Sequence, residues 1–188
     1  STGKAENKFG LSIQSFKNFY YNIKKFKNLK VEAISVHIGS QILSDKPYKK
    51  TLDVLAEVIN DLDLKLKYVD LGGGFGIQYE KKDKLINLKN YSKQVENFKK
   101  KINCNIIFEP GRSLVGNAGI LVSKIQYIKK GYNKDFIILD AGMNDFMRPA
   151  LYDAKHNIIP ISKNNKKSTK TIEFVGPICE STCKFTKY

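Results

Sequence analysis

The stretch from Leu66 to Gly76, LKYVDLGGGFG, decides the fold class that we expect for this chain. The apolar residues of 66–71 predict a strand, and Gly72-Gly73-Gly74 follow it directly. The same pattern, a predicted strand followed by a polar or glycine-rich segment, occurs in two other stretches, Val31–Gln41 (VEAISVHIGSQ) and Cys104–Arg112 (CNIIFEPGR).

Helices are predicted around the strands at 31–38, 66–71 and 104–109. Ser12 can cap the first helix, in which apolar residues recur at helical spacing as far as Phe26. Pro47 marks the start of the second helix, and the third covers about 88–101. The residues expected to face inward are Leu52, Leu55, Ile59 and Leu62 in the second helix and Tyr91, Val95 and Phe98 in the third. Strands separated by helices imply parallel pairing.

The polar segments all follow the carboxyl ends of their strands, where a (β/α)8 barrel has its active site. A full barrel needs about 250 residues, and only three barrel strands are predicted here. We therefore expect residues 1–112 to be the C-terminal portion of a (β/α)8 TIM barrel in a longer protein. Residues 113–188 are expected to form part of a C-terminal β domain, a β-sandwich or β-barrel, with strands at 120–128, 136–140 and 171–179.

The composition excludes several classes of protein. With 188 residues, 11 Phe and 10 Tyr, the chain has the length and apolar content to bury a core. It contains no apolar run long enough to span a membrane and no visible secretory signal. Its three cysteines, Cys104, Cys179 and Cys183, do not form a disulfide framework or a zinc pattern. We expect no metal and a reducing, cytoplasmic location.

The net charge of +15 raises the question of nucleic-acid binding. We do not expect it, because the lysines are spread along the chain and no nucleic-acid-binding motif is present. The densest basic run, Ser162–Lys170, is predicted to be a solvated loop. Only Arg112 and Arg148 are arginines. A retained arginine in so lysine-rich a chain indicates a planar grip on a carboxylate or phosphate, although an ordinary ion pair is the alternative.

Several residues carry possible chemistry, each with a plainer alternative. The glycine triplet can present N–H groups to an anion, or it can simply make a tight turn. Glu109 could keep a ring nitrogen protonated, or it could pair with Arg112. His37 could stack on a flat ring or act as an acid–base group, but a lone histidine is more often structural. Cys179 could donate a proton or be buried, and burial is what we expect of Cys104.

In order, the motifs HIGSQ, LGGGFGI, EPGR, MNDFMRPALYDAKH and GPICES resemble the diaminopimelate decarboxylase family. This family belongs to the alanine-racemase-like, fold-type III pyridoxal-phosphate decarboxylases. The resemblance extends from Lys8 to about Phe185. Arg148-Pro149-Ala150-Leu151-Tyr152 and Cys179-Glu180-Ser181 narrow it to the diaminopimelate branch.

The resemblance implies a pyridoxal 5'-phosphate cofactor and a role for each matching residue. His37 would pack on the pyridine ring and Glu109 would pair with its nitrogen. The residues implied around the phosphate end are Ser40, Gly73, Gly74, Gly111 and Arg112. Those implied around the distal carboxylate and amine of the substrate are Arg112, Arg148, Tyr152 and Glu180. Cys179 would return the proton after CO2 leaves, and it would reach the site from the second subunit of a homodimer.

The implied activity is decarboxylation of meso-2,6-diaminopimelate to L-lysine, the last step of lysine biosynthesis. The lysine that forms the family's Schiff base lies in an early strand, and no matching motif precedes Gly10. At position 183 this chain has Cys where the family usually has Asp. Two alternatives stay open: a related decarboxylase of basic or polyamine-precursor amino acids, and a non-catalytic remnant of the fold.

Overall fold

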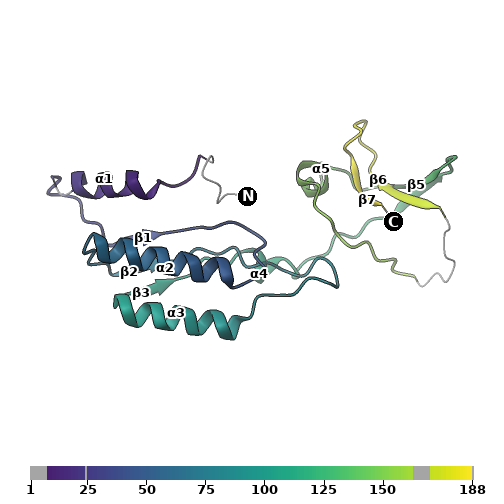
Figure 1. The fold of residues 1–188 in the computed structure, drawn as a ribbon. Helices are drawn as coiled ribbons and strands as arrows, with labels where there is room; N and C mark the ends of the chain where they lie inside the picture. The colour runs from purple at the N-terminus through teal and green to yellow at the C-terminus, as the bar shows by residue number, and fades with distance from the viewer. Residues whose placement is uncertain (1–7, 24, 163–169, 188) are drawn as a thin grey trace. The chain divides into compact units, whose positions relative to one another are not determined.

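The computed structural model describes residues 8–23, 25–162 and 170–187 (Figure 1). Most of the basic run Ser162–Lys170 lies outside these described residues. The chain divides into two compact units, Ser1–Gly119 and Ile120–Tyr188, which we call the first and the second unit. Among the described residues, no helix has the length and apolar character that crossing a membrane requires.

The first unit contains the predicted parallel sheet. Its strands are β1 (Ala33–Ser35), β2 (Tyr68–Asp70) and β3 (Asn105–Ile107), in the order β1-β2-β3. The pairing puts Val69 of β2 beside Ile34 of β1 and Ile106 of β3. All three strands are shorter than predicted, because the chain bends into loops soon after each one. Some backbone hydrogen bonds continue past the strand ends, such as the one from Glu109 N to Gly72 O at 2.8 Å.

Three helices of the first unit, α1 (Ile13–Ile23), α2 (Lys46–Asp61) and α3 (Leu88–Ile102), agree with the prediction. The Ser12 hydroxyl caps α1 by accepting a hydrogen bond from Ser15 N at 3.1 Å. Asn87 caps α3 in the same way through Asn90 N. Local side-chain chemistry thus fixes where α1 and α3 begin.

The apolar faces of α2 and α3 form the core of the first unit. The two helices pack against each other (Figure 1), and all seven residues predicted to face inward are buried. Val69 at the centre of the sheet has no exposed surface. The loops at the carboxyl ends of the strands therefore start from a closely packed base.

The second unit is a mixed four-stranded sheet in the order β4-β5-β6-β7. Its strands are β4 (Ile125–Lys129), β5 (Lys134–Leu139), β6 (Thr171–Val175) and β7 (Lys184–Lys187). The β5–β6 pair is parallel, whereas the other two pairs are antiparallel.

Several sequence-based boundaries in the second unit are wrong. Residues 120–124 and 176–179 are not strand. At 176–179, Gly176 N bonds to Cys183 O as the chain turns, and Pro177 has no N–H to extend the ladder. The sequence did not predict β7, nor the short helices α4 (Arg112–Val115) and α5 (Arg148–Tyr152).

Candidate functional site

The loops after β1, β2 and β3 meet through their backbones at the carboxyl edge of the sheet. Gly72 has a φ of 65°, and a Cβ there would lie 2.4 Å from Val36 O and 3.1 Å from His37 Nδ1. On its other side, the Gly72 carbonyl accepts the hydrogen bond from Glu109 N. His37 and Glu109 therefore flank one glycine, as their places at the strand ends predicted.

Gly73 and Gly74 fit positions that leave no room for a side chain. A Cβ on Gly73 would lie 2.1 Å from Glu109 O, and one on Gly74 would lie 2.2 Å from Gly39 O. Gly74 also has a φ of 92°, in the left-handed region that favours glycine. The triplet is thus a close junction of three loops as well as a turn.

Tyr48, on α2, contacts this junction through its hydroxyl and its ring. Its hydroxyl donates a hydrogen bond to Gly73 O at 2.9 Å, and its ring stacks on Phe75 with the centroids 5.2 Å apart. Tyr91 packs edge-on against both rings. Burial raises the pKa of Tyr48 and raises that of Tyr91 to about 12, so both hydroxyls stay neutral at physiological pH.

Arg112 is held by a side chain from the loop after β1. Its guanidinium donates to Gln41 Oε1 at 3.2 Å and lies 6.0 Å from the centre of the Tyr79 ring. Among the described residues, Arg112 forms no ion pair with Glu109, which was the alternative role considered for both. The guanidinium keeps N–H groups that Gln41 does not use.

Three backbone amides near this edge could bind an anion. Within the described part of the chain, the N–H groups of Gly73, Gly74 and Gly111 have no protein acceptor. Gly111 is exposed, with open space where a Cβ would be, and Ser40 is exposed as well. These donors and Arg112 offer hydrogen bonds and positive charge from three loops.

In the second unit, Arg148 and Tyr152 lie one helical turn apart on α5. The Arg148 guanidinium lies 5.7 Å from the centre of the Tyr152 ring, and Tyr152 is exposed. Pro149 occupies the first turn of this short helix, and Asp153 ends it with a φ of 50°. The helix therefore presents a cation and a phenol together.

Cys179 and Glu180 lie in a turn that Cys183 anchors. Cys179 is exposed, whereas Cys183 is buried and accepts a hydrogen bond from Met143 N at 3.3 Å. The Glu180 carboxylate accepts from the Ser181 hydroxyl at 3.0 Å and from Thr182 N at 3.5 Å, and these bonds lower its pKa. Burial raises the pKa of Cys104, whose buried position agrees with the prediction.

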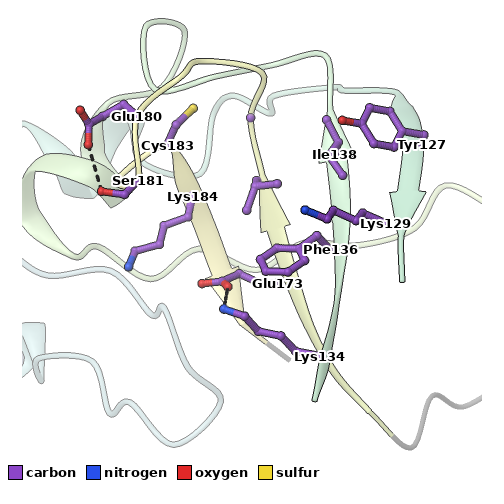
Figure 2. Close-up of a pocket in the computed structure, with 12 residues that line it drawn as sticks. Tyr127, Lys129, Lys134, Phe136, Ile138, Glu173, Glu180, Ser181, Cys183 and Lys184 are labelled. Atoms are coloured by element: carbon purple, nitrogen blue, oxygen red, sulfur yellow. Dashed lines mark hydrogen bonds and ion pairs between the residues drawn. The ribbon is translucent and has the colours of Figure 1, made fainter. Parts of the chain in front are cut away.

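A cavity of about 460 Å³ also opens on one face of the second unit's sheet (Figure 2). Glu180 and Ser181 lie at one end of it, and the ion pair between Lys134 and Glu173 lies at the other. Sequence reasoning missed this cavity. The sequence feature that could have indicated it is the two-residue alternation of side chains along β5, which puts Lys134, Phe136 and Ile138 on the face that lines the cavity.

Residues 1–116 match the sequence family described as "Pyridoxal-dependent decarboxylase, pyridoxal binding domain". The chain belongs to this family. The predicted cofactor class, pyridoxal phosphate, is therefore confirmed.

The chain is similar over nearly its whole length to proteins named diaminopimelate decarboxylase. It is 40% identical to the one from Aquifex aeolicus over 184 residues, which are 96% of this chain and 44% of the relative. It is 38% identical over 190 residues to the one from Helicobacter pylori, covering 100% of this chain and 47% of the relative. The chain thus spans less than half the length of these curated relatives.

Two solved structures agree with the fold. The crystal structure of diaminopimelate decarboxylase from Helicobacter pylori complexed with L-lysine has a TM-score of 0.88 at 38% identity, covering 99% of this chain and 46% of that one. A lysine/ornithine decarboxylase from Vibrio vulnificus, complexed with cadaverine, has a TM-score of 0.83 at 19% identity, covering 97% of this chain and 51% of that one. The second likeness shows the fold alone.

The strand-end loops of the first unit fit a phosphate-bearing cofactor. Gly73 and Gly74 have no side chain to cover their N–H groups, and within the described part of the chain these groups have no protein acceptor. Those amides and Arg112 match the chemistry of a phosphate. Sequence reasoning assigned no role to Tyr48 or Gln41, because their part in this edge depends on side-chain contacts across loops.

Proposed function

We propose that the whole protein to which this chain belongs converts meso-2,6-diaminopimelate to L-lysine and CO2. One observation carries the proposal: Arg148 and Tyr152 share one face of α5, in a segment matched by relatives named for this reaction. The guanidinium of Arg148 can form two parallel hydrogen bonds with the distal carboxylate of meso-2,6-diaminopimelate, whereas ornithine has no distal carboxylate.

In this proposal the strand-end loops of the first unit hold the cofactor. Gly73, Gly74, Gly111, Ser40 and Arg112 bind its phosphate end. Pyridoxal phosphate, when bound, supplies a protonated ring that withdraws the electron pair left behind by CO2.

His37 and Glu109 act on the ring of the cofactor. His37 orients the ring by packing on it. Glu109 holds a proton at the ring nitrogen, because a carboxylate beside that nitrogen favours its charged form. Their support is their shared contact with Gly72 at the edge of the sheet.

The second unit is proposed to act on the substrate. Arg148 and Tyr152 bind the distal carboxylate together with Arg112, and Glu180 binds the distal amine. The Glu180 carboxylate is exposed, so an amine can reach it. Cys179 returns a proton to the carbon that has lost CO2, and its exposure suits that task.

The wider architecture belongs to the same proposal. Residues 1–112 would be the C-terminal part of a (β/α)8 barrel and residues 113–188 part of the β domain. A cytoplasmic homodimer would bring Cys179 of one subunit to the site of the other. The Schiff-base lysine would lie in the part of the protein that this chain does not cover.

The decisive assay measures turnover of meso-diaminopimelate and of ornithine by the whole protein. We expect turnover of meso-diaminopimelate only; turnover of ornithine alone would support the alternative decarboxylase, and no turnover would support a non-catalytic remnant.

Two variants test the assigned residues. Cys179→Ala should remove most activity while the absorbance of the bound cofactor persists. Arg148→Lys should raise KM strongly, because a point charge does not replace a fork. Tyr132→Ala is the matched control, because Tyr132 is 97% exposed. It should change neither the activity nor the KM.

The location of the lysine has its own test. The 188-residue chain is mixed with pyridoxal phosphate and reduced with borohydride, and the product is weighed by mass spectrometry. With 31 lysines in the chain, scattered partial adducts are expected, but no single lysine should be modified preferentially. One stoichiometric adduct would show that a lysine of this chain anchors the cofactor, and it would overturn this part of the proposal.

A further inference from the structure

Gln41 joins the three strand-end loops through one side-chain amide. Its Oε1 accepts hydrogen bonds from Ile77 N and from the Arg112 guanidinium, both at 3.2 Å. Its Nε2 donates to Ile77 O at 2.6 Å. Gln41 lies in the loop after β1, Ile77 lies in the loop after β2, and Arg112 begins α4 directly after the loop that follows β3.

The backbone at Gln41 shows that this side chain is kept at a conformational cost. Gln41 has a φ of 60°, in the left-handed region that glycine occupies most easily. Gly76 leaves space beside it, because a Cβ at Gly76 would lie 3.2 Å from Gln41 Cδ. A long amide side chain at a position that glycine occupies more easily points to a function of that side chain.

The contact with Arg112 shows what the function would be. A free arginine side chain samples many rotamers, and ordering it on binding lowers affinity. Here Gln41 Oε1 holds one edge of the guanidinium, and the Tyr79 ring lies 6.0 Å from its centre. The remaining N–H groups can then bind an oxyanion as a preformed fork.

We propose that Gln41 is a positioning residue that orients the Arg112 guanidinium for an oxyanion, a phosphate or a carboxylate. The proposal deepens the proposed function and rests on it. Its structural part, the fixing of Arg112, can be tested whether or not the protein decarboxylates diaminopimelate.

Phenylglyoxal modification reads the state of Arg112 directly. The reagent reacts with guanidinium groups, and peptide mass spectrometry of the whole protein follows Arg112 and Arg148 separately, so that Arg148 serves as the internal control. Gln41→Gly removes the side chain and relaxes the backbone. We expect Arg112 to react several-fold faster in this variant, while the rate at Arg148 is unchanged. An unchanged rate at Arg112 would overturn the proposal.

Two further variants separate the positioning of Arg112 from the tying of the loops. Gln41→Glu keeps an acceptor for Arg112 but loses the donor to Ile77 O, so Arg112 should stay slow to react. If it reacts as fast as in Gln41→Gly, the contact with Ile77 is what matters and the proposal is wrong. Gln78→Ala is the matched control, because among the described residues the Gln78 side chain donates only to Lys81 O and Asp83 O, in the same loop. It should leave the rate at Arg112 unchanged.

Protection and kinetics identify the oxyanion. In the cofactor-free protein, protection of Arg112 by inorganic phosphate but not by glutarate would assign it to a phosphate, and the reverse would assign it to a carboxylate. Protection by neither would refute the oxyanion role. In the whole enzyme, Gln41→Gly should raise the KM for meso-diaminopimelate or the Kd for pyridoxal phosphate about tenfold, with a smaller effect on kcat. A fall in kcat alone would contradict positioning for binding.

Discussion

The two units of this chain differ in the charged side chains that they bury. In the first unit, the core between α2, α3 and the parallel sheet is a single apolar cluster that includes Leu55 and Val69. In the second unit, Asp135 and Glu173 are 6% and 4% exposed, and each forms an ion pair with a lysine. Among the described residues they are the buried charged side chains.

This difference affects how the two sets of candidate site residues are held. The loops with His37, Gly73 and Glu109 rise from an apolar core, which opens only at a large cost in free energy. The turn with Cys179 and Glu180 follows a sheet whose buried carboxylates depend on partly exposed lysines. We therefore expect the second unit to open more readily and to respond more to solution conditions.

The largest expected effect tests the apolar core. Leu55→Ala should lower the free energy of unfolding of the first unit by about 2 to 5 kcal/mol, because it leaves a cavity in the core. Hydrogen exchange followed by mass spectrometry can locate the loss in peptides of that unit. Leu88→Ala, at a residue 62% exposed, is the control and should cost less than about 0.5 kcal/mol. Equal losses would show that burial in this core does not set its stability.

The next prediction concerns the buried carboxylate of β6. Glu173→Gln removes the charge that Lys134 faces, and it should destabilise the second unit by about 1 to 2 kcal/mol. The loss is limited because the Lys134 side chain is 39% exposed and water can solvate it. Chemical denaturation monitored by circular dichroism measures the change. Asp53→Asn, in the exposed pair with Lys49, should change stability by less than about 0.5 kcal/mol. A larger effect at Asp53 would contradict the contrast between the units.

A smaller effect is expected at the start of α3, where the first unit also relies on a polar contact. Asn87→Ala removes the acceptor for Asn90 N and should cost about 1 kcal/mol. Thermal unfolding measures the stability of this variant and of the control, Asn90→Ala. The control keeps the cap, because the backbone N–H of residue 90 remains when its side chain is lost. If both variants are equally stable, the cap does not contribute.

The last prediction concerns acid. The Lys130 ammonium, followed by the Gly131 N–H, holds the pKa of Asp135 below its ordinary value of 3.8. A carboxyl whose pKa is lower in the folded state stabilises the fold above its ordinary pKa and loses this effect as the pH falls through the lowered value. Stability of the second unit should therefore fall below about pH 4. Asp135→Asn should flatten this dependence in acid titrations followed by circular dichroism, whereas Asp53→Asn should not. A parallel fall in both variants would rule out Asp135 as the source.

The elements that the sequence predicted best are those with local causes. The third helix was expected over 88–101 and spans Leu88–Ile102, because its apolar period lies within the helix and its cap, Asn87, directly precedes it. The strand ends depend on distant partners, which explains why 120–124 was wrongly assigned. The sequence of β7, KFTK, has no apolar run, and this strand exists through its pairing with β6.

The candidate site divides in the same way. Residues at the ends of predicted parallel strands, such as His37 and Glu109, were expected to converge, and they meet at Gly72. The side-chain contacts of Gln41 and Tyr48 could not be predicted, because they depend on rotamers and on the approach of separate loops. The proposed roles of Arg148, Tyr152, Cys179 and Glu180 stay predictions.

The parallel sheet also has a consequence for the order of folding during synthesis. Ser35 and Asp70, which hydrogen-bond across β1 and β2, are 35 residues apart in the chain, and Gln41 and Arg112 are 71 residues apart. Contacts between such distant residues form slowly, and a chain made from its N-terminus exposes unpaired strand edges until the later partner emerges from the ribosome. The loops of this region cannot complete their contacts until Arg112 has been synthesised, and until then the edge of β2 that pairs with β3 is unpaired and is a target for chaperones.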